Sequence, residues 1–329
     1  MPADTPHPTP NTPHHQDTAA DAWRVSLHGG HSGEFCDHAD GTLREMLTAA
    51  VRYGYHTFGV SEHVPRCESR FLYPEEVALG WTVEKITADF DRYQEALTPL
   101  VHEFEDRLVV LRGFECEVVP SDRYVELMNG YRHRRLADGS PAFDYCVGSV
   151  HHVAEMSIDG PPAVFQGLVE EFGGLEPLAI RYYETVAAMV SSLRPEMVAH
   201  IDLIKKNCGP IGLSTSALES PSVQRAALGA LEAVRAAGSI LDLNTAAWRK
   251  GLNEPYPAPW LVRAANSMGI GFCFGDDSHR PGDVGAGIDR AADYLIENGV
   301  THITILTRDG GVRTGQVIQQ TVPLGNLLY

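Results

Sequence analysis

The sequence predicts an α/β fold in which a mostly parallel sheet closes into a barrel. Short runs of β-branched residues alternate with segments whose apolar residues recur at helical spacing, an order typical of parallel strands joined by crossover helices. Seven or eight such units follow residue 22, a number that fits a closed barrel better than an open sheet. Histidine and carboxylate residues follow the strand runs, and in an α/β barrel these strand ends meet at one rim.

The expected strands are short. They cover residues 23–28, 57–62, 108–115, 144–150, 197–201, 239–244 and 270–275, with a further candidate at 302–307. Between them, Thr42 and Glu45 form a capping box at the start of a helix that Gly54 ends. Apolar spacing and end signals predict further helices over 86–100, from Ser220 to Gly238 and over 284–298.

Length and composition favour one large domain. The chain has 329 residues, of which 43% are apolar, so it can bury a full core. Residues 1–22 are rich in Pro, Thr, Asp and His and are expected to form a disordered tail. No shift in composition or charge divides residues 23–329, which are expected to form the barrel domain.

The net charge and the cysteines indicate which classes of partner and which cellular compartment to expect. With 26 basic and 43 acidic side chains, the net charge of −17 disfavours binding to a phosphate backbone. No run approaches the roughly 20 apolar residues of a membrane span, and the N-terminus lacks a secretory signal. The six scattered cysteines contain no C-x-x-C pair, which favours a reducing, cytoplasmic location. The oligomeric state stays open.

Eight of the fifteen histidines follow the first seven strand candidates, together with Glu115 and Asp277. A single histidine at a strand end is more often a hydrogen-bonded structural residue than a ligand, but eight at such ends are not explained in that way. Converging imidazoles and carboxylates would repel and desolvate one another without a cation. Nitrogen and oxygen ligands without thiolate suit Zn, Mn or Fe, and their number predicts two or three metal ions. Cys36, Cys116 and Cys273 lie near the same ends and are interpreted as core cysteines rather than thiolate ligands.

The order of these motifs resembles a known family. His-x-x-His with a trailing His is followed by Glu-His, Gly-x-Glu, Ser-Val-His, His-x-Asp, Asn-Thr-Ala and Asp-x-His, an order that resembles the PHP (polymerase and histidinol phosphatase) superfamily. Segments 33–38, 61–66, 244–250 and 254–257 are similar to its histidinol-phosphate phosphatase branch. The resemblance spans about 24–287.

The resemblance implies a distorted (β/α)7 TIM-like barrel with a trinuclear metal centre. It also implies hydrolysis of L-histidinol phosphate, a step of histidine biosynthesis, by a hydroxide that bridges the metals. Carried over position by position, the metal ligands fall on His31, His38, His63, Glu115, His151, His200, Asp277 and His279, with His28 as a ninth.

Two features depart from the family pattern. The family opens with His-x-His, which places both rings on one strand face, whereas this chain has His28-Gly-Gly-His31. A bend or bulge at the glycines would turn both rings inward; otherwise His28 points elsewhere and one metal is held weakly or lost. Asp276 stands where Ser is usual, and we expect it to add negative charge at the rim.

Further residues are assigned to the reaction. Asp277, His279 and Arg249 are the expected catalytic residues, and a metal-bound water, His152 or Asp202 is a candidate proton donor to the leaving group. Basic side chains would bind the phosphate. Residues at the rim would bind the amine or imidazole of histidinol. The expected substrate-binding residues are Asn244, Arg249, Lys250, Arg66, Glu117, His152 and Asp202.

Other functions stay open from the sequence. The same ligand set would serve a phosphoesterase acting on nucleotides or oligonucleotide ends, although the negative charge weighs against it. A C–N hydrolase is less favoured, since nothing points to the bridging carbamylated lysine common in that class. The irregular His28–His31 spacing would also fit a non-catalytic metal-binding protein with a degraded site.

Overall fold

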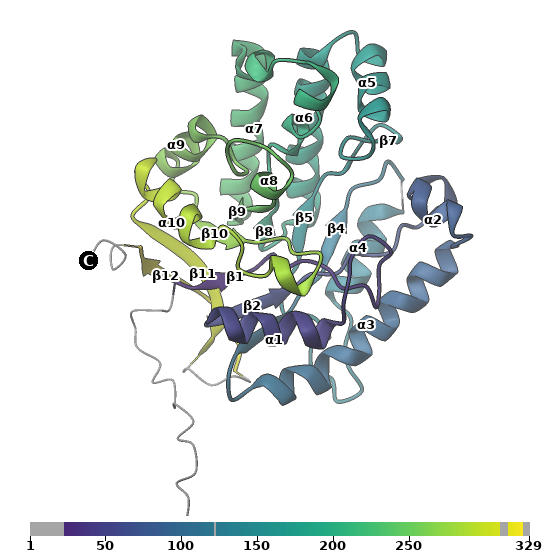
Figure 1. Cartoon of the computed structure of the whole chain (residues 1–329), viewed down its shortest axis with the longest axis vertical. Helices are drawn as coiled ribbons and strands as arrows, with labels where there is room; N and C mark the ends of the chain where they lie inside the picture. The colour runs from purple at the N-terminus through teal and green to yellow at the C-terminus, as the bar shows by residue number, and fades with distance from the viewer. Residues whose placement is uncertain (1–22, 122, 310–314, 325–329) are drawn as a thin grey trace, which may run out of the picture.

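The computed structural model describes residues 23–121, 123–309 and 315–324, so the expected tail at 1–22 lies outside the described residues. Their α/β fold is a single domain built on two parallel sheets (Figure 1). The first sheet has the order β1 (Val25–Ser26), β2 (Thr57–Val60), β3 (Val109–Arg112). The second has the order β10 (Phe272–Gly275), β9 (Ile240–Asn244), β8 (Met197–Val198), β5 (Val147–Ser149), β4 (Glu115–Glu117).

Backbone contacts join the two sheets at both edges. On one side, the Leu27 amide donates to the Phe274 carbonyl at 2.9 Å, and the Asp277 amide donates to the His28 carbonyl at 2.8 Å. On the other, β3 runs on into β4, whose first residue Glu115 pairs with His63 just after β2. All pairs within both sheets are parallel, so the carboxyl ends of the strands face one side of the molecule.

The longer helices cover the outside of the strands (Figure 1). The α-helices of the described residues are α1 (Leu43–Tyr53), α2 (Pro74–Ala78), α3 (Val83–Phe104), α4 (Tyr124–Arg132), α5 (Pro162–Glu171), α6 (Leu175–Leu193), α7 (Pro221–Ala237), α8 (Ala246–Arg249), α9 (Pro259–Ser267) and α10 (Ile288–Glu297). The predicted capping box of Thr42 and Glu45 is present, and Gly54 ends α1 in the left-handed conformation. Among the helices in the described ranges, even the 22-residue α3 lacks the apolar length needed to cross a bilayer.

Helix α6 is the longest of the helices that were not predicted from the sequence. Its buried side chains recur every three or four residues, from Leu175 to Leu193, so it carries the same apolar stripe as the helices that were predicted. The contacts of α6 are mainly with α7, and the two helices form one flank of the domain. The sequence of α6 therefore does carry a helical signal.

The extra strand candidate at 302–307 does not join the parallel sheets. It forms β11 (His302–Arg308), which pairs antiparallel with β12 (Val317–Pro323) in a separate two-stranded sheet. A second short antiparallel pair, β6 (His152–Val153) with β7 (Met156–Ser157), follows β5. Both pairs lie outside the two parallel sheets whose carboxyl ends face one side.

Candidate metal centre

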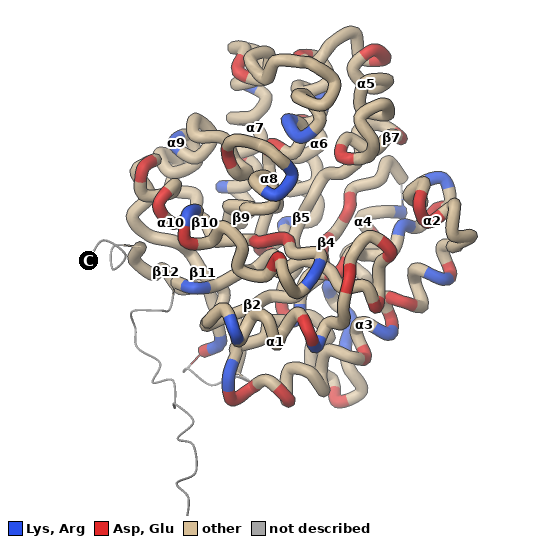
Figure 2. Tube along the Cα trace, viewed as in Figure 1, with Lys and Arg blue, Asp and Glu red and all other residues tan. Residues whose placement is uncertain are grey.

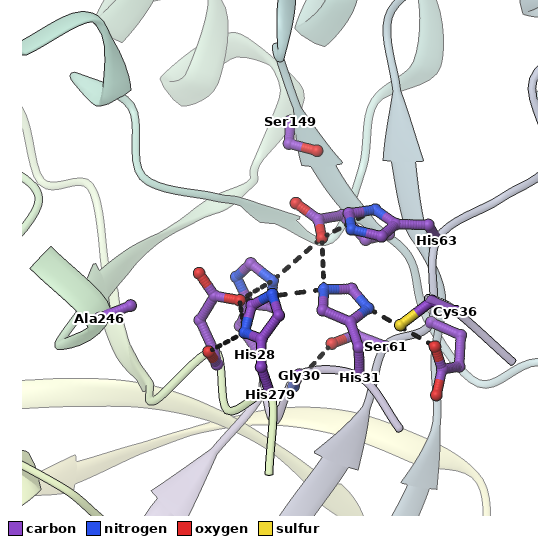
Figure 3. A network of polar contacts seen from close by, with 12 residues as sticks. His28, Gly30, His31, Cys36, Ser61, His63, Ser149, Ala246 and His279 are labelled. Carbon is purple, nitrogen blue, oxygen red and sulfur yellow. Dashed lines mark hydrogen bonds and ion pairs between the residues drawn. The ribbon is translucent and has the colours of Figure 1, made fainter. Parts of the chain in front are cut away.

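Glu115, the first residue of β4, is buried and lies at the centre of a group of histidines. Figure 3 shows three of these histidines, His28, His31 and His63, close together. The Oε2 atom of Glu115 is 3.3 Å from His28 Nε2, 3.3 Å from His31 Nε2 and 3.4 Å from His63 Nδ1. These three histidines come from the ends of the first two strands, and their rings meet because parallel strands end on the same side.

The other carboxylate oxygen of Glu115 meets a second pair of rings. Its Oε1 atom is 3.3 Å from His200 Nε2 and 3.6 Å from His151 Nε2. Asp277, after β10, adds a second carboxylate, with Oδ1 3.8 Å from both His28 Nε2 and His279 Nδ1. Two carboxylates therefore face one set of imidazoles.

Possible ligand atoms lie within 4.8 Å of one another in four groups: His28, His31 and Glu115; His28, His200 and Asp277; His31, Asp277 and His279; and His63, Glu115 and His151. These groups contain eight of the nine predicted ligands. The ninth, His38, belongs to none of the groups found among the described residues, but its ring centroid lies 5.2–5.7 Å from those of His279, His63 and His31.

The donor set fits divalent metal ions better than a network of hydrogen bonds. Glu115 Oε1 is among the buried atoms without a hydrogen-bond partner, although it lies 3.3 Å from His200 Nε2 and 3.6 Å from His151 Nε2. A buried polar atom without a partner costs about 1–3 kcal/mol. Imidazole nitrogens and carboxylate oxygens that converge at 3.3–3.9 Å without hydrogen-bond geometry are arranged as ligands around a cation would be.

The pKa shifts of the histidines also favour bound cations. Burial lowers the pKa of His31, but Glu115 and Glu62 outweigh it and raise the pKa to about 9. Burial also lowers the pKa of His279, to about 3, although Asp277 opposes the shift. The protein alone thus holds charged and neutral imidazoles side by side, whereas bound cations would balance the carboxylates and keep every ring neutral.

The bend predicted at Gly29-Gly30 is present, and both flanking rings turn inward. Gly30 has φ = +92°, and His28 and His31 each bring Nε2 to 3.3 Å from Glu115 Oε2. At its other ring nitrogen, His28 Nδ1 lies 2.9 Å from Asp242 Oδ2, a contact that orients the ring toward Glu115. Of the two alternatives that the His28-Gly-Gly-His31 spacing leaves open, the structure has the one in which both rings face Glu115.

A close approach of two backbones makes glycine necessary in this bend. A Cβ atom on Gly30 would lie 1.9 Å from the carbonyl oxygen of Ser278 and 2.3 Å from its nitrogen. We therefore expect Gly30→Ala to destabilise the protein by at least about 2 kcal/mol in urea unfolding, through overpacking and left-handed strain. Gly229→Ala is the matched control, because a Cβ atom at this position in α7 meets nothing within 4 Å and should be neutral or stabilising. Equal stability of the two variants would contradict this account of the bend.

Asp277 is held in an unusual backbone conformation. It is a non-glycine residue with φ = +46°, and its carbonyl accepts from Arg249 Nη2 at 2.8 Å and from His279 Nδ1 at 2.9 Å. Burial raises the pKa of its carboxyl, but Lys250, His28 and His279 outweigh burial and hold the pKa well below its usual range. Asp277 is therefore a fixed anion. Its positive φ is a form of backbone strain that is typical of functional sites.

A pocket of about 280 Å³ opens above these side chains. Eight of the predicted ligands contribute to its lining, while His28 lies behind it, fully buried. The remaining lining residues are Asp37, Tyr73, Glu75, Asp159, Gly160, Leu203, Lys206 and Lys250. In Figure 2 a basic segment next to α8 lies close to the acidic segments at the ends of β4 and β10.

Comparison with known proteins agrees with this geometry. The model of the PHP domain family matches residues 28–246, about two thirds of the chain. The chain belongs to the PHP domain family. Two curated relatives of this PHP protein are a Schizosaccharomyces pombe protein named "Probable histidinol-phosphatase", 32% identical over 86% of this chain and 90% of the relative, and the Saccharomyces cerevisiae histidinol-phosphatase, 27% identical over 82% and 88%.

Two solved structures share the fold. A crystal structure of a candidate histidinol phosphatase from Listeria monocytogenes has a TM-score of 0.71 and 25% identity, covering 81% of this chain and 99% of its own. A histidinol phosphate phosphatase from Lactococcus lactis, complexed with zinc, L-histidinol and phosphate, has a TM-score of 0.61 and 16% identity, covering 86% and 96%.

Of the predicted substrate-binding residues in this PHP protein, Lys250 lines the pocket, with Nζ 3.7 Å from Asp277 Oδ2. Arg249 is directed elsewhere, since its guanidinium donates to the carbonyls of Asp276 and Asp277. Asn244 is fully buried, and its amide donates to Asp242 Oδ2 at 2.9 Å and to Asp277 Oδ2 at 3.3 Å. Arg249 and Asn244 therefore hold the residues around the site rather than face the pocket.

Two more of these residues also contact protein rather than the pocket. Asp202 accepts from the Ala258 amide at 2.8 Å and lies 2.8 Å from Lys205 Nζ. His152 is 5% exposed and its ring stacks on Tyr73, with centroids 6.0 Å apart. Neither belongs to the pocket lining.

Three predictions about single residues can be compared with the structure. Asp276 does not add charge at the rim: it is fully buried and accepts from Tyr55 Oη at 2.8 Å and the Gly285 amide at 2.7 Å, so that expectation is wrong. The carboxylate of the next residue, Asp277, instead faces His28 and His279, so the two neighbouring carboxylates have different partners. Cys116 and Cys273 are buried core cysteines, as expected, and burial raises the pKa of Cys116 to about 12.

Sequence reasoning missed several residues that surround the site. Lys206 and Asp159 line the pocket from loops after the fifth and fourth expected strands, and their ammonium and carboxylate groups lie 3.6 Å apart. Tyr73 lines it from the N-cap of α2. None of these follows a strand end directly, so the strand-end signal could not find them. Asp242 did carry a signal, because it lies two residues before Asn244 on the same strand face.

Proposed function

We propose that this PHP protein hydrolyses L-histidinol phosphate to L-histidinol and phosphate with the help of two or three divalent metal ions. The observation that carries the proposal is the convergence of imidazoles on Glu115 beneath an open pocket. The names of the curated relatives, which align with more than 80% of this chain, support the choice of substrate.

The metal ligands in this proposal are His28, His31, His38, His63, Glu115, His151, His200, Asp277 and His279. Their nitrogen and oxygen atoms suit Zn, Mn or Fe. When bound, such ions neutralise the charge of a phosphomonoester and lower the pKa of water, which is the chemistry that its hydrolysis requires. Zinc is the first choice, and the Lactococcus lactis neighbour contains it.

The side chains of the protein then have separate tasks. Asp277 carries a fixed negative charge beside His28 and His279 and would accept a hydrogen bond from the attacking water. Lys250 and Lys206 place two ammonium groups in the pocket, where they would hold phosphate oxygens. Arg249 assists indirectly, by fixing the Asp277 backbone.

The barrel expected from the sequence is part of the same proposal. If β3 and β4 count as one strand, the hydrogen bonds between β1 and β10 join seven parallel strands into one ring. The distortion would lie where β3 passes its pairing from β2 to β5 through β4. We also propose a reducing, cytoplasmic location, which the six unpaired cysteines support.

Metal content provides one test. Protein purified without chelator is expected to contain more than one equivalent of Zn, Mn or Fe by elemental analysis, because four ligand groups share the cluster. Dialysis against a chelator should remove the metal together with the activity, and added Zn²⁺ or Mn²⁺ should restore both. Less than half an equivalent, without gain on reconstitution, would contradict the metal centre.

Substrate preference provides the second test. Phosphate release from L-histidinol phosphate is expected to be at least about tenfold more efficient, as kcat/KM, than release from nucleoside monophosphates, which is a difference of about 1.4 kcal/mol. Both substrates are measured on the same metal-loaded preparation. An equal or reversed preference would favour a nucleotide phosphoesterase, and no release from either substrate would favour a non-catalytic protein.

A further inference from the structure

A series of three buried charged side chains, Glu117, Arg66 and Glu76, lies beside the candidate metal centre and outside the pocket lining. Its inner member is Glu117, which follows Glu115 by two residues on β4 and is 2% exposed. Glu117 Oε1 lies 3.1 Å from His63 Nδ1 and 3.4 Å from His151 Nδ1. His151 therefore has one ring nitrogen beside each carboxylate, since its Nε2 faces Glu115 at 3.6 Å.

That arrangement is the one by which an outer carboxylate orients a histidine ligand. A carboxylate that accepts the proton of one ring nitrogen leaves the other nitrogen free to bind a metal, and it also fixes the rotation of the ring. Glu117 is placed to do this for His151. His63 differs, because its Nδ1 atom faces both carboxylates, 3.1 Å from Glu117 Oε1 and 3.4 Å from Glu115 Oε2, so Glu117 restrains this second ring of the ligand group through the shared nitrogen.

The next group in this series is Arg66, which is 5% exposed. Its Nη1 donates to Glu117 Oε2 at 3.0 Å, and its Nη2 donates to Glu76 Oε1. Both ends of the guanidinium are thus occupied by buried carboxylates, so Arg66 is not free to bind a phosphate. Removing one partner of a buried ion pair leaves an uncompensated charge, so each of these three groups depends on the others.

This series of charged groups reaches the pocket lining at Tyr73. Tyr73 donates its hydroxyl hydrogen to Glu117 Oε1, and its ring lies under the Arg66 guanidinium, 4.3 Å from centroid to Cζ. The Tyr73 amide donates to Glu76 Oε2 at 2.8 Å. Tyr73 and Glu75 both line the pocket, so the groups that hold Glu117 also hold this part of the pocket lining.

We propose that Glu117 is a positioning residue that holds His63 and His151 for the metal, and that Arg66 and Tyr73 link this position to segment 73–80. Metal binding and the ordering of segment 73–80 are therefore coupled. The inference concerns the site of the proposed phosphatase and rests on its metal centre, but not on the identity of its substrate.

The test uses the full chain, Zn²⁺ and no phosphorylated substrate. Zn²⁺ affinity is measured by competition with a chromophoric chelator, and amide hydrogen exchange of residues 73–80 is followed with and without Zn²⁺. In the wild-type protein, Zn²⁺ should slow exchange in this segment. Glu117→Gln should weaken Zn²⁺ binding about 10- to 100-fold, and Arg66→Met should largely abolish the response of segment 73–80 to Zn²⁺.

The control variant weakens an ion-pair cluster elsewhere in the domain, whose central carboxylate side chain, that of Asp144, is 5% exposed. Asp144 lies 2.9 Å from Arg112 Nη2 and 2.7 Å from Arg308 Nη2 and touches no member of the ligand groups. Asp144→Asn should lower the overall stability while leaving Zn²⁺ affinity within about twofold of wild type. This comparison separates positioning from a general loss of stability.

Two results would overturn the inference: wild-type Zn²⁺ affinity in Glu117→Gln, or exchange in segment 73–80 that does not respond to Zn²⁺ in the wild-type protein. Folding of Glu117→Gln is checked by circular dichroism, and Tyr73→Phe, which removes only the hydroxyl contact with Glu117, should reduce the response to Zn²⁺ if the parent variant does not fold. Because no phosphate ester is used, failure here would leave the proposed reaction standing, and failure of the substrate test would leave this result intact.

Discussion

Asp277→Asn is expected to lower kcat/KM for L-histidinol phosphate at least about 1000-fold, or roughly 4 kcal/mol of transition-state stabilisation, while the protein stays folded. Asp277 Oδ1 lies 3.8–3.9 Å from His28, His31 and His279, so it takes part in two of the four ligand groups. Asparagine keeps the size of the side chain but removes the charge that balances the cation.

His279→Ala should act in the same direction, because His279 shares a ligand group with Asp277 and lines the pocket. Phosphate release is measured at saturating Zn²⁺, and the fold is checked by circular dichroism. The matched control is Asp289→Asn, whose side chain is 69% exposed in α10 and which should retain wild-type rates. A wild-type rate in Asp277→Asn or His279→Ala would remove that residue from the site.

Glu115→Gln is expected to lose more than one equivalent of metal and at least about 1000-fold in kcat/KM. Five imidazole nitrogens lie within 3.6 Å of its two oxygens, and two of the four ligand groups include it. A glutamine cannot supply the negative charge that these groups need, and its amide protons would face buried ring nitrogens.

Glu232→Gln is the control for this variant, because Glu232 is exposed on α7 and should keep its full metal content. Metal is measured by elemental analysis after gel filtration in chelator-free buffer. Retention of every metal equivalent by Glu115→Gln would show that the cluster is held by the histidines and Asp277 without its central carboxylate. Such a result would also contradict the role of Glu115 in the proposed site.

The sequence allowed many of the elements and the positions of the ligands to be predicted, because both have local signals. The capping box at Thr42 depends on residues three apart, and the alternation of strands and helices can be counted along the chain. Since parallel strands end on one side, residues that follow strands must gather there whatever the details of packing. Glu115 and Asp277 were found by this rule, and they do lie together.

Side-chain direction was less predictable. Arg66, Glu117 and Arg249 lie at or after strand ends, as substrate-binding residues would. However, Arg66 and Glu117 pair with each other, and Arg249 donates to the Asp277 carbonyl. Those partners, such as Glu76 for Arg66, lie on neighbouring segments whose relative position has no sequence signal. Lys206 shows the reverse case, since it reaches the pocket from a loop that no motif marks.

The sequence by itself determined which residues can form the centre, since residue type and position after a strand are properties of the chain. Only the tertiary structure decided which of them face the pocket and which support it. The separation of Asp276 from Asp277 illustrates the reason: the carboxylate of Asp276 accepts from Tyr55, whereas that of Asp277 faces His28. Both partners lie far away in sequence and meet these two carboxylates only in the folded domain, so the sequence carries no signal for which carboxylate each of them contacts.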